Sequence, residues 1–222
     1  MDKLYFFCRS ANKPPGEGAN ETGNPDNYSA LAVLGEWRKT LSNLHVCSIT
    51  GCRCGGEYTW SGYRWRSIEH AFQAMKAGLQ DNDRAFNFTL DSGHFIGKGD
   101  GATAQNHRNV VVLTQENNNL WAAKSSSIMH DITRAKYAQC PNAAAVLDAT
   151  LDAELWHVGS RGRSHRFEHL ESIRSRTRAA AKCAPVRSQV AERAARATTR
   201  ATLNAEKEEE NDDDESFYVQ YH

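Results

Sequence analysis

The stretch "YRWRSIEHAFQAMKAG", residues 63–78, says most about how this chain folds. Ser67 is placed to cap a helix whose first turn holds Glu69, where the helix dipole favours a carboxylate. Gly78 is a natural stop for that helix. Four apolar residues recur at helical spacing and form the expected core stripe: Ile68, Phe72, Met75 and Leu79. The stretch therefore predicts an amphipathic helix that packs on a hydrophobic core.

A polar stripe lies beside the apolar one on the same predicted helix. At about 100° per residue, Glu69, Gln73 and Lys76 fall within roughly 60° of one another. One interpretation is a solvent-facing stripe with a weak Glu–Lys attraction, worth a few tenths of a kcal/mol. The other is the rim of a pocket from which Trp60, Trp65 and Phe72 exclude water. In such a pocket the pKa of a Glu or a Lys is shifted, as acid–base or imine chemistry requires.

Composition places the chain among globular proteins. It has 222 residues, 40% of them hydrophobic, and a formal net charge of zero, so composition alone points to neither nucleic acid nor membrane. No apolar run approaches the roughly 20 residues of a membrane helix. The start, "MDKLYFFCRSANKPP", has a short apolar stretch closed by Arg9, unlike a secretory signal. Six cysteines without such a signal are expected to be mostly reduced thiols, and we expect a cytoplasmic protein.

The charges are unevenly distributed along the chain. Basic residues dominate from Arg161 to Arg200, and "EKEEENDDDE" then reverses the sign. The stretch "AERAARATTRATLNAEKEEE" has almost no large apolar residues, so it cannot bury enough surface to offset its ordering entropy. We therefore predict one domain over residues 1–178 and a disordered, basic-then-acidic tail over 179–222. The basic block is either solvated, the usual case for charge runs, or a contact for nucleic acid.

Within the domain the pattern is mostly helical. Residues 16–29 read as a polar, Gly-rich loop, and 45–65 as one or two short hairpins. A run of valines at 110–112 suits a strand or a buried helical turn, and helical patterns follow to residue 139. Residues 142–158 read as helical with a break near Thr150, and 166–178 as an amphipathic helix with Phe167, Leu170 and Ile173 on one face. The predicted fold class is mainly α with a small β element.

Several motifs resemble a known family. "WRSIEHAFQAMKA" (65–77) is similar to the signature of the NADAR, or YbiA-like, family, which reads W-x-S-x-E-H-x-x-Q-A-x-K. Further family elements follow in order: "LSNL" (41–44), the eight-residue spacing from Trp121 to Met129, "AKYAQCP" (135–141) and "LDATLDAEL" (147–155). The resemblance spans roughly Leu4 to Arg174, and the Trp-to-Lys signature is its most specific part.

The resemblance implies a single compact YbiA-like domain and hydrolysis of a ribose C1′–N glycosidic bond, without a cofactor. The favoured reaction is removal of ADP-ribose from guanine in nucleic acid, or from a related ADP-ribosyl substrate. One alternative is cleavage of ribosylamino-pyrimidine intermediates of riboflavin synthesis. Another is a non-catalytic module that binds ADP-ribose or NAD. The expected partner is a nucleotide or ADP-ribosyl substrate, with nucleic acid as a further partner and no membrane.

The resemblance also suggests catalytic residues. Glu69 is the expected general acid/base. Lys76 is expected either to stabilise phosphate charge or to attack the opened anomeric carbon and form an imine. Asp152 is a second carboxylate for the reaction or, equally, a helix N-cap.

Substrate-binding roles follow from the same motifs. Ser42 and Asn43 are expected to hold hydroxyls, Lys136 a phosphate, and the tryptophans the base or the cationic sugar. Trp121 and Tyr137 have simple core packing as the alternative. The full expected set is Ser42, Asn43, Trp65, Gln73, Trp121, Lys136, Tyr137 and His157.

The chain departs from the family pattern after "LDATLDAEL". His157 stands where many bacterial members have Glu, and "GSRGRSHRF", with Arg161 and Arg163, replaces a D-x-x-W-G-x-G segment. A more basic closing segment suits a diphosphate or nucleic-acid phosphates. The stretch "FIGKGDGATAQ" (95–105) is expected to form a loop over the site.

A rival site lies in "HVCSITGCRCG". His45, Cys47, Cys52 and Cys54 supply four residue types that zinc accepts. Their spacing is not that of a paired CxxC knuckle, and reduced loop thiols are the alternative. We therefore predict a site without a metal and leave zinc as the weaker hypothesis.

Overall fold

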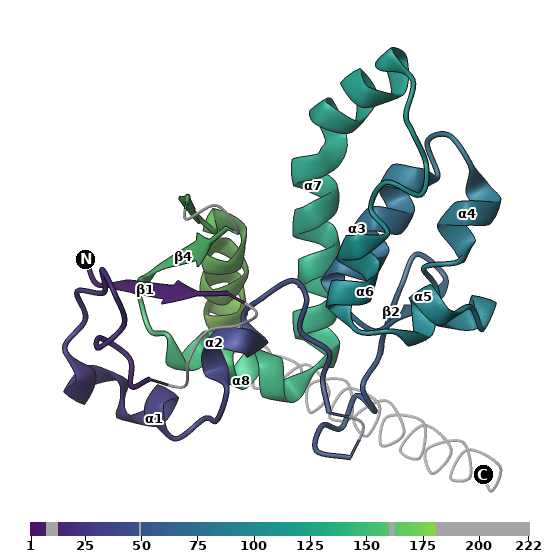
Figure 1. Ribbon diagram of the computed structural model, residues 1–222. Coiled ribbons are helices and arrows are strands. Elements are labelled where there is room, and N and C mark those ends of the chain that lie inside the picture. The colour runs from purple at the N-terminus through teal and green to yellow at the C-terminus, as the bar shows by residue number, and fades with distance from the viewer. Residues whose placement is uncertain (8–12, 49, 160–162, 181–222) are drawn as a thin grey trace, which may run out of the picture. The chain divides into compact units, whose positions relative to one another are not determined.

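The computed structural model describes residues 1–7, 13–48, 50–159 and 163–180 (Figure 1). The chain divides into two compact units, Met1–Arg174 and Ser175–His222. Of the second unit, residues 175–180 are described, and they are helical. The tail predicted over 179–222 therefore falls, apart from its first two residues, outside the described part of the chain.

The first unit is mainly helical with two small sheets, as the sequence predicts. Its helices are α1 (Ser29–Ala32), α2 (Trp37–Thr40), α3 (Ile68–Ala77), α4 (Asn82–Phe86), α5 (Phe95–Lys98), α6 (Gly101–Asn106), α7 (Gln115–Gln139) and α8 (Pro141–Ala149). Its 3₁₀ turns are η1 (Pro25–Tyr28) and η2 (Leu90–Ser92). Its strands are β1 (Lys3–Phe6), β2 (Tyr58–Trp60), β3 (Tyr63–Trp65), β4 (Glu154–Val158) and β5 (Ser164–Arg166). Residues 168–180 form a further helix.

The larger sheet joins the two ends of the first unit in the order β1-β4-β5. Strand β1 runs parallel to β4, with Leu4 opposite Leu155 and Phe6 opposite His157, and β5 pairs antiparallel with β4. The prediction of a helix over 154–158 is therefore wrong, although the break at Thr150 is confirmed as the C-cap of α8. A strand forms because β1, far away in sequence, supplies its backbone partners and buries Leu155 completely.

A buried ion pair organises the Gly-rich loop over residues 16–29. The side chain of Glu21 has no exposed surface, and that of Arg38 on α2 is 5% exposed. The two form a salt bridge, and Glu21 also accepts hydrogen bonds from the backbone N–H groups of Tyr5, Gly16 and Gly18. The loop is thereby tied to β1 and α2 through one carboxylate, which its polar composition did not reveal.

The predicted hairpin and helix over residues 58–77 are confirmed. Strands β2 and β3 pair antiparallel across a turn in which Ser61 and Gly62 both have positive φ, as a tight hairpin turn requires. Ser67 caps α3 by accepting from the backbone N–H of His70, and the helix ends at Gly78.

The buried face of α3 differs from the predicted stripe. The fully buried apolar residues are Ile68, Ala71, Ala74 and Ala77, whereas Phe72, Met75 and Leu79 are half-buried. Small alanines allow close contact between α3 and its neighbours α4, α6 and α7, all of which pack against it (Figure 1). The larger apolar side chains consequently lie at the edges of these contacts.

Two other predictions are corrected in the middle of the chain. Residues 110–112, the valine run, are neither strand nor helix. Residues 95–105, expected as a loop, form the short helices α5 and α6, capped by His94 and Asp100. A Cβ at Gly101, the first residue of α6, would lie 2.2 Å from the carbonyl oxygen of Leu44, so the glycine allows α6 to approach the loop over 41–44 closely.

The terminal helix starts at residue 168, two residues later than predicted, because Arg166 belongs to β5. Its predicted buried face is confirmed for Leu170 and Ile173, and Phe167, just before the helix, is buried with them. Among the described residues, no helix has both the length and the apolar composition needed to cross a membrane.

Candidate functional site

Glu69 is buried within a polar cluster on α3. It is 8% exposed and Gln73 is 7% exposed, so the solvent-facing interpretation of this stripe is wrong. The Gln73 Nε2 donates to Glu69 Oε1 at 2.7 Å. The backbone N–H of Glu69 donates to the Asn43 carbonyl oxygen at 3.1 Å, so the loop over 41–44 covers the start of α3. The carboxylate is therefore held in a fixed position by its own helix and by this loop.

The surroundings of Glu69 favour its protonated form. Burial raises the pKa of this carboxyl above its ordinary value, against the opposing effects of the Gln73 hydrogen bond and of the Arg108 and Lys76 charges. Lys76 is half-buried, and its Nζ donates to the backbone carbonyl of Arg108 at 3.5 Å. Arg108 itself is exposed. A carboxyl with a raised pKa beside two cations is typical of functional sites.

Two buried acceptors in this cluster have no hydrogen-bond partner. They are the Asn43 Oδ1 and the Gln73 Oε1. The Asn43 Nδ2 is placed instead toward the Met129 sulfur on α7, at 3.5 Å. Buried acceptors without a donor are uncommon in native proteins and are suited to receiving hydrogen bonds from a ligand.

Helix α7 supplies the aromatic wall of the cluster. The Trp121 ring lies 4.7 Å from the ring of Phe72, measured between centroids. Trp121 is half-buried, so part of its surface is accessible. The structure thus connects four of the expected site residues, Asn43, Glu69, Gln73 and Lys76, while Trp121 meets α3 at the neighbouring Phe72.

Ser42 has a supporting position beside this cluster. It is 1% exposed, its Oγ accepts from the backbone N–H of Leu44 at 3.3 Å, and its carbonyl accepts from His45 at 3.0 Å. These bonds form the turn that presents Asn43. The hydroxyl of Ser42 is therefore used inside the protein.

Trp65 lies on the opposite side of α3 and lines a separate cavity of 520 Å³. Its Nε1 donates to the carbonyl of Trp60 at 2.9 Å. The cavity is formed mainly by apolar side chains: Tyr63, Trp65, Ala74, Met75, Leu79, Ala85 and Phe86. Glu69 and Lys76 are not among its lining residues. The expectation that Trp65 and Glu69 share this pocket does not fit the arrangement of the described residues.

Asp152 lies in the turn before β4. It is exposed and lines a cavity of 370 Å³ together with Asp2 and Tyr28. The alternative of a helix N-cap is wrong, because a strand follows this turn.

His157 packs within an aromatic cluster in the β1–β4–β5 sheet. Its ring stacks on Phe167 at 5.0 Å and meets the edge of Phe6 at 5.5 Å. Burial lowers its pKa to about 4, and the positive potential of nearby His165 acts in the same direction. The described contacts link neither His157 nor Asp152 to Glu69.

Lys136 and Tyr137 lie with a group of cysteines. The Lys136 side chain is almost fully buried at 1% exposure, and its Nζ donates to the carbonyl of His45 at 2.6 Å. Burial lowers the pKa of Lys136, and the neighbouring cysteines oppose that shift. Burial raises the pKa of Tyr137, whose hydroxyl is buried without a hydrogen-bond partner. Both residues carry electrostatic interactions with Cys47 and Cys140.

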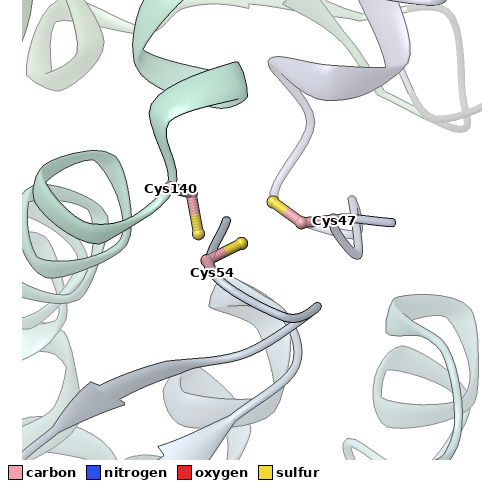
Figure 2. A group of neighbouring side chains, drawn as sticks. All are labelled: Cys47, Cys54 and Cys140. Carbon is pink, nitrogen blue, oxygen red and sulfur yellow. The ribbon is translucent and has the colours of Figure 1, made fainter. Parts of the chain in front are cut away.

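The cysteine group differs from the set suggested by the sequence. The sulfurs of Cys47, Cys54 and Cys140 all lie within 4.8 Å of one another and point toward a common centre (Figure 2). The Cys52 sulfur is 2.9 Å from that of Cys54. His45, which the sequence suggested as a ligand, does not belong to the group of closely spaced ligand atoms, whereas Cys140, which it did not suggest, does.

Two residues of these clusters were missed from the sequence. Arg108 has no local signal, because it follows α6 in a stretch that matches no motif. Cys140 had one: it ends "AKYAQC" where the family pattern has Asn. A cysteine that replaces an amide next to a Lys-Tyr pair was a signal for a thiol cluster.

Comparison with known proteins gives a structural match. No family model and no curated protein match the chain. The chain is similar to the NMR structure of the E. coli protein YbiA, with 16% sequence identity and a TM-score of 0.43. The similarity covers 84% of this chain and 89% of YbiA.

Proposed function

We propose that this protein is an N-glycosidase that hydrolyses the bond between C1′ of a ribose and a base nitrogen. The observation that carries the proposal is Glu69: a buried carboxyl with a raised pKa, hydrogen-bonded by Gln73 and close to Lys76 and Arg108. The signature-like stretch over 65–77 supplies the reaction class, and the cluster supplies groups suited to it.

The proposed chemistry is a proton transfer on each side of one bond cleavage. Protonated Glu69 donates its proton to the leaving nitrogen as the C1′–N bond breaks and positive charge develops on the ribose. The resulting carboxylate then accepts a proton from the water whose oxygen bonds to C1′. The products are the free base and a ribose hydroxylated at C1′, and Glu69 returns to its initial state. A raised pKa suits the first step, because the acid must be protonated before it donates.

The sugar is proposed to bind through the two acceptors that lack partners. Ribose hydroxyls are donors, and the Asn43 Oδ1 and Gln73 Oε1 are buried acceptors in the same cluster as Glu69. A hydroxyl that reached either oxygen would remove the cost of leaving it unsatisfied. The accessible part of the Trp121 ring is available to stack on the base or to face the cationic sugar.

Phosphate is proposed to bind at the cationic side of the cluster. Lys76 is half-buried and Arg108 is exposed, so both are open to a charged ligand. Two cations favour a diphosphate over a single phosphate, and arginine binds phosphate oxygens with two hydrogen bonds. The favoured substrate is accordingly ADP-ribose linked to guanine in nucleic acid. A ribosylamino-pyrimidine phosphate is the second candidate.

The test is base release measured by mass spectrometry. The full-length protein is incubated with DNA that carries ADP-ribosylated guanine and, separately, with a ribosylamino-pyrimidine phosphate. We expect unmodified guanine to reappear in the DNA, with free ADP-ribose as the second product. Glu69→Gln should lower the rate of this release by about 10²–10⁴-fold. Glu116→Gln, which changes an exposed carboxylate in the first turn of α7, should not.

Each outcome separates the alternatives. Release from the pyrimidine alone would assign the riboflavin-type reaction. Binding of ADP-ribose without release from either substrate would make the protein a binding module and overturn the proposal. Equal release by wild type and Glu69→Gln would remove Glu69 from the mechanism.

A further inference from the structure

The cysteine cluster brings together parts of the chain that are far apart in sequence. Cys47 and Cys54 belong to the loop before β2, whereas Cys140 lies between α7 and α8 (Figure 2). All four cysteines of the described part of the chain, Cys47, Cys52, Cys54 and Cys140, are free thiols within this region. Reduced loop thiols, as expected from the sequence, would not require three sulfurs from two segments to converge.

We propose that Cys47, Cys54 and Cys140 bind a structural zinc ion, with Cys52 as the fourth ligand. Zinc bound by four thiolates has Zn–S distances of about 2.3 Å, which places tetrahedral sulfurs about 3.8 Å apart. The three sulfurs already lie within 4.8 Å of one another, and the Cys52 sulfur is 2.9 Å from Cys54. Three of the four sulfurs therefore already lie near tetrahedral spacing, whereas the Cys52 sulfur is close to that of Cys54 but outside the group of three and would have to move toward its centre.

The loop that carries Cys52 and Cys54 is shaped for a thiolate site. Gly55 and Gly56 both have positive φ, which brings the backbone N–H of Gly56 to the sulfur of Cys54. Backbone N–H groups that donate to sulfur stabilise the thiolate and fix its direction, as outer-shell partners do in metal sites. Any other residue would be strained in this "CRCGG" turn.

Cys140 lies at the start of a helix, although its hydrogen bond with Cys47, burial and the neighbouring Cys54 raise the pKa of its thiol. It is the N-cap residue of α8, a nine-residue helix, and its side chain makes no capping hydrogen bond. The positive end of a helix dipole favours an anion at this position. At 1% exposure the sulfur is also shielded from solvent, as in structural zinc sites.

The buried groups around the sulfurs suit a negatively charged metal centre. Zinc with four thiolates carries two negative charges, and a buried cation offsets one of them. Lys136 is buried beside the sulfurs and interacts with all four cysteines, so its protonated amine would supply such a charge once the metal is bound. The buried Tyr137 hydroxyl, which has no other partner, is an additional donor that interacts with Cys47 and Cys140.

The ion would have a structural role. It would connect the loop over 45–57 to the α7–α8 junction. The cysteine thiols would release their protons to solvent when the ion binds. Lys136 already makes one such connection by donating to the carbonyl of His45. Thiolate ligands select zinc over magnesium or calcium, and all four sulfurs are used, so no position is left for a substrate. This inference does not depend on the proposed glycosidase reaction.

The experiment measures metal content and ligand type in the full-length protein. The protein is reduced, stripped with a chelator and titrated with zinc, and the bound metal is counted by elemental analysis. We expect about one zinc ion per chain and a rise in melting temperature that the chelator reverses. With cobalt in place of zinc, we expect a sulfur-to-cobalt charge-transfer band and the visible bands of tetrahedral cobalt.

Variants then assign the ligands. Cys140→Ser and Cys47→Ser should lose the cobalt charge-transfer intensity, whereas Arg53→Ser, an exposed change in the same loop, should keep it. Cys140→His keeps a zinc ligand and should retain metal even if Cys140→Ser fails to fold. Failure of the reduced wild type to bind zinc or cobalt in a stoichiometric amount would overturn the proposal. Cobalt bound without the sulfur band, or a disulfide among these cysteines in the freshly isolated protein, would do the same.

Discussion

Glu69→Gln tests whether a buried carboxyl is kept for chemistry rather than for stability. The substitution preserves the size and shape of the side chain. In the wild type the Gln73 Nε2 donates to Glu69 Oε1 at 2.7 Å, and a Gln at position 69 still offers an amide oxygen to this donor. The backbone bond from residue 69 to the Asn43 carbonyl does not involve the side chain and should remain. The variant therefore removes a titratable proton and little else.

The expected effect on stability follows from the direction of the pKa shift. Because the pKa of Glu69 is raised in the folded state, its contribution to stability is full below the unfolded pKa. That contribution is lost as pH rises through the folded pKa. At pH 7, which lies above the unfolded pKa, the wild type has lost part of that contribution, whereas a Gln at position 69 does not titrate. The free energy of unfolding of Glu69→Gln should therefore equal or exceed that of wild type at pH 7, and the gain should shrink on acidification.

The expected effect on activity has the opposite sign. A positioned general acid/base contributes about 10²–10⁴-fold to rate, which corresponds to about 2.7–5.5 kcal/mol of transition-state stabilisation. Binding of the substrate should change little, because the polar contacts of Asn43, Gln73, Lys76 and Arg108 remain. A variant that is as stable as wild type and binds as well, but turns over far more slowly, identifies a catalytic group.

The assay combines single-turnover base release, substrate binding by calorimetry and urea unfolding at pH 7 and pH 5. Glu116→Gln is the matched control, since it also removes a carboxylate from the first turn of a helix. Turnover by Glu69→Gln within threefold of wild type would refute the reasoning. A large loss of stability at pH 7 would refute it as well, because Glu69 would then be a structural anion.

The remaining predictions concern Lys76, the buried ion pair and a buried histidine. If Lys76 forms an imine, borohydride should trap the ribose of the substrate on wild type but not on Lys76→Ala. Lys124→Ala, which changes an exposed lysine, is the control and should trap the ribose as wild type does. If none of the three proteins traps the ribose, Lys76 is a phosphate ligand whose loss raises KM. Glu21→Gln should lower the free energy of unfolding by about 3–5 kcal/mol, because it leaves a buried guanidinium without its counter-charge. The exposed Glu36→Gln should cost less than about 1 kcal/mol, and equal effects in urea unfolding would contradict this explanation. Burial lowers the pKa of His70 to about 4. The free energy that His70 contributes to folding should therefore fall by about 2 kcal/mol from pH 7 to pH 5. A His70→Gln variant whose stability has the same pH dependence as wild type would disprove this explanation.

Local signals in the sequence were enough to predict the element that carries the proposed catalytic residues. Ser67, the helical spacing after it and Gly78 set the limits of α3, because capping and helix termination depend on neighbouring residues alone. The β-forming residues and glycines over 45–65 predicted a hairpin for the same reason, and the structure places its turn at Ser61 and Gly62. The angular positions of Glu69, Gln73 and Lys76 on one face also follow from helix geometry alone.

The depth at which that face is buried was decided by tertiary packing. The same three residues fit a solvent stripe or a pocket rim until α7 and the loop over 41–44 cover them. Long-range strand pairing likewise determined β4. The Ala- and Leu-rich sequence before β4 made the whole stretch resemble a helix, and only pairing with β1 supplies the hydrogen bonds of a strand. In neither case is the deciding partner within the local window on which sequence patterns depend.

Tertiary structure also redistributed the expected site residues. The sequence determined which side chains have the chemistry, namely carboxylates, amides, cations, aromatic rings and thiols, because residue type alone sets pKa range and hydrogen-bonding capacity. It did not determine which of them meet. Lys136 and Tyr137 lie with Cys47 and Cys140 instead of with Glu69, because α7 is long enough to contact α3 in one part and the cysteine loop at its end. Contacts between segments about 90 residues apart depend on how helices pack, and that information exists only in the folded chain.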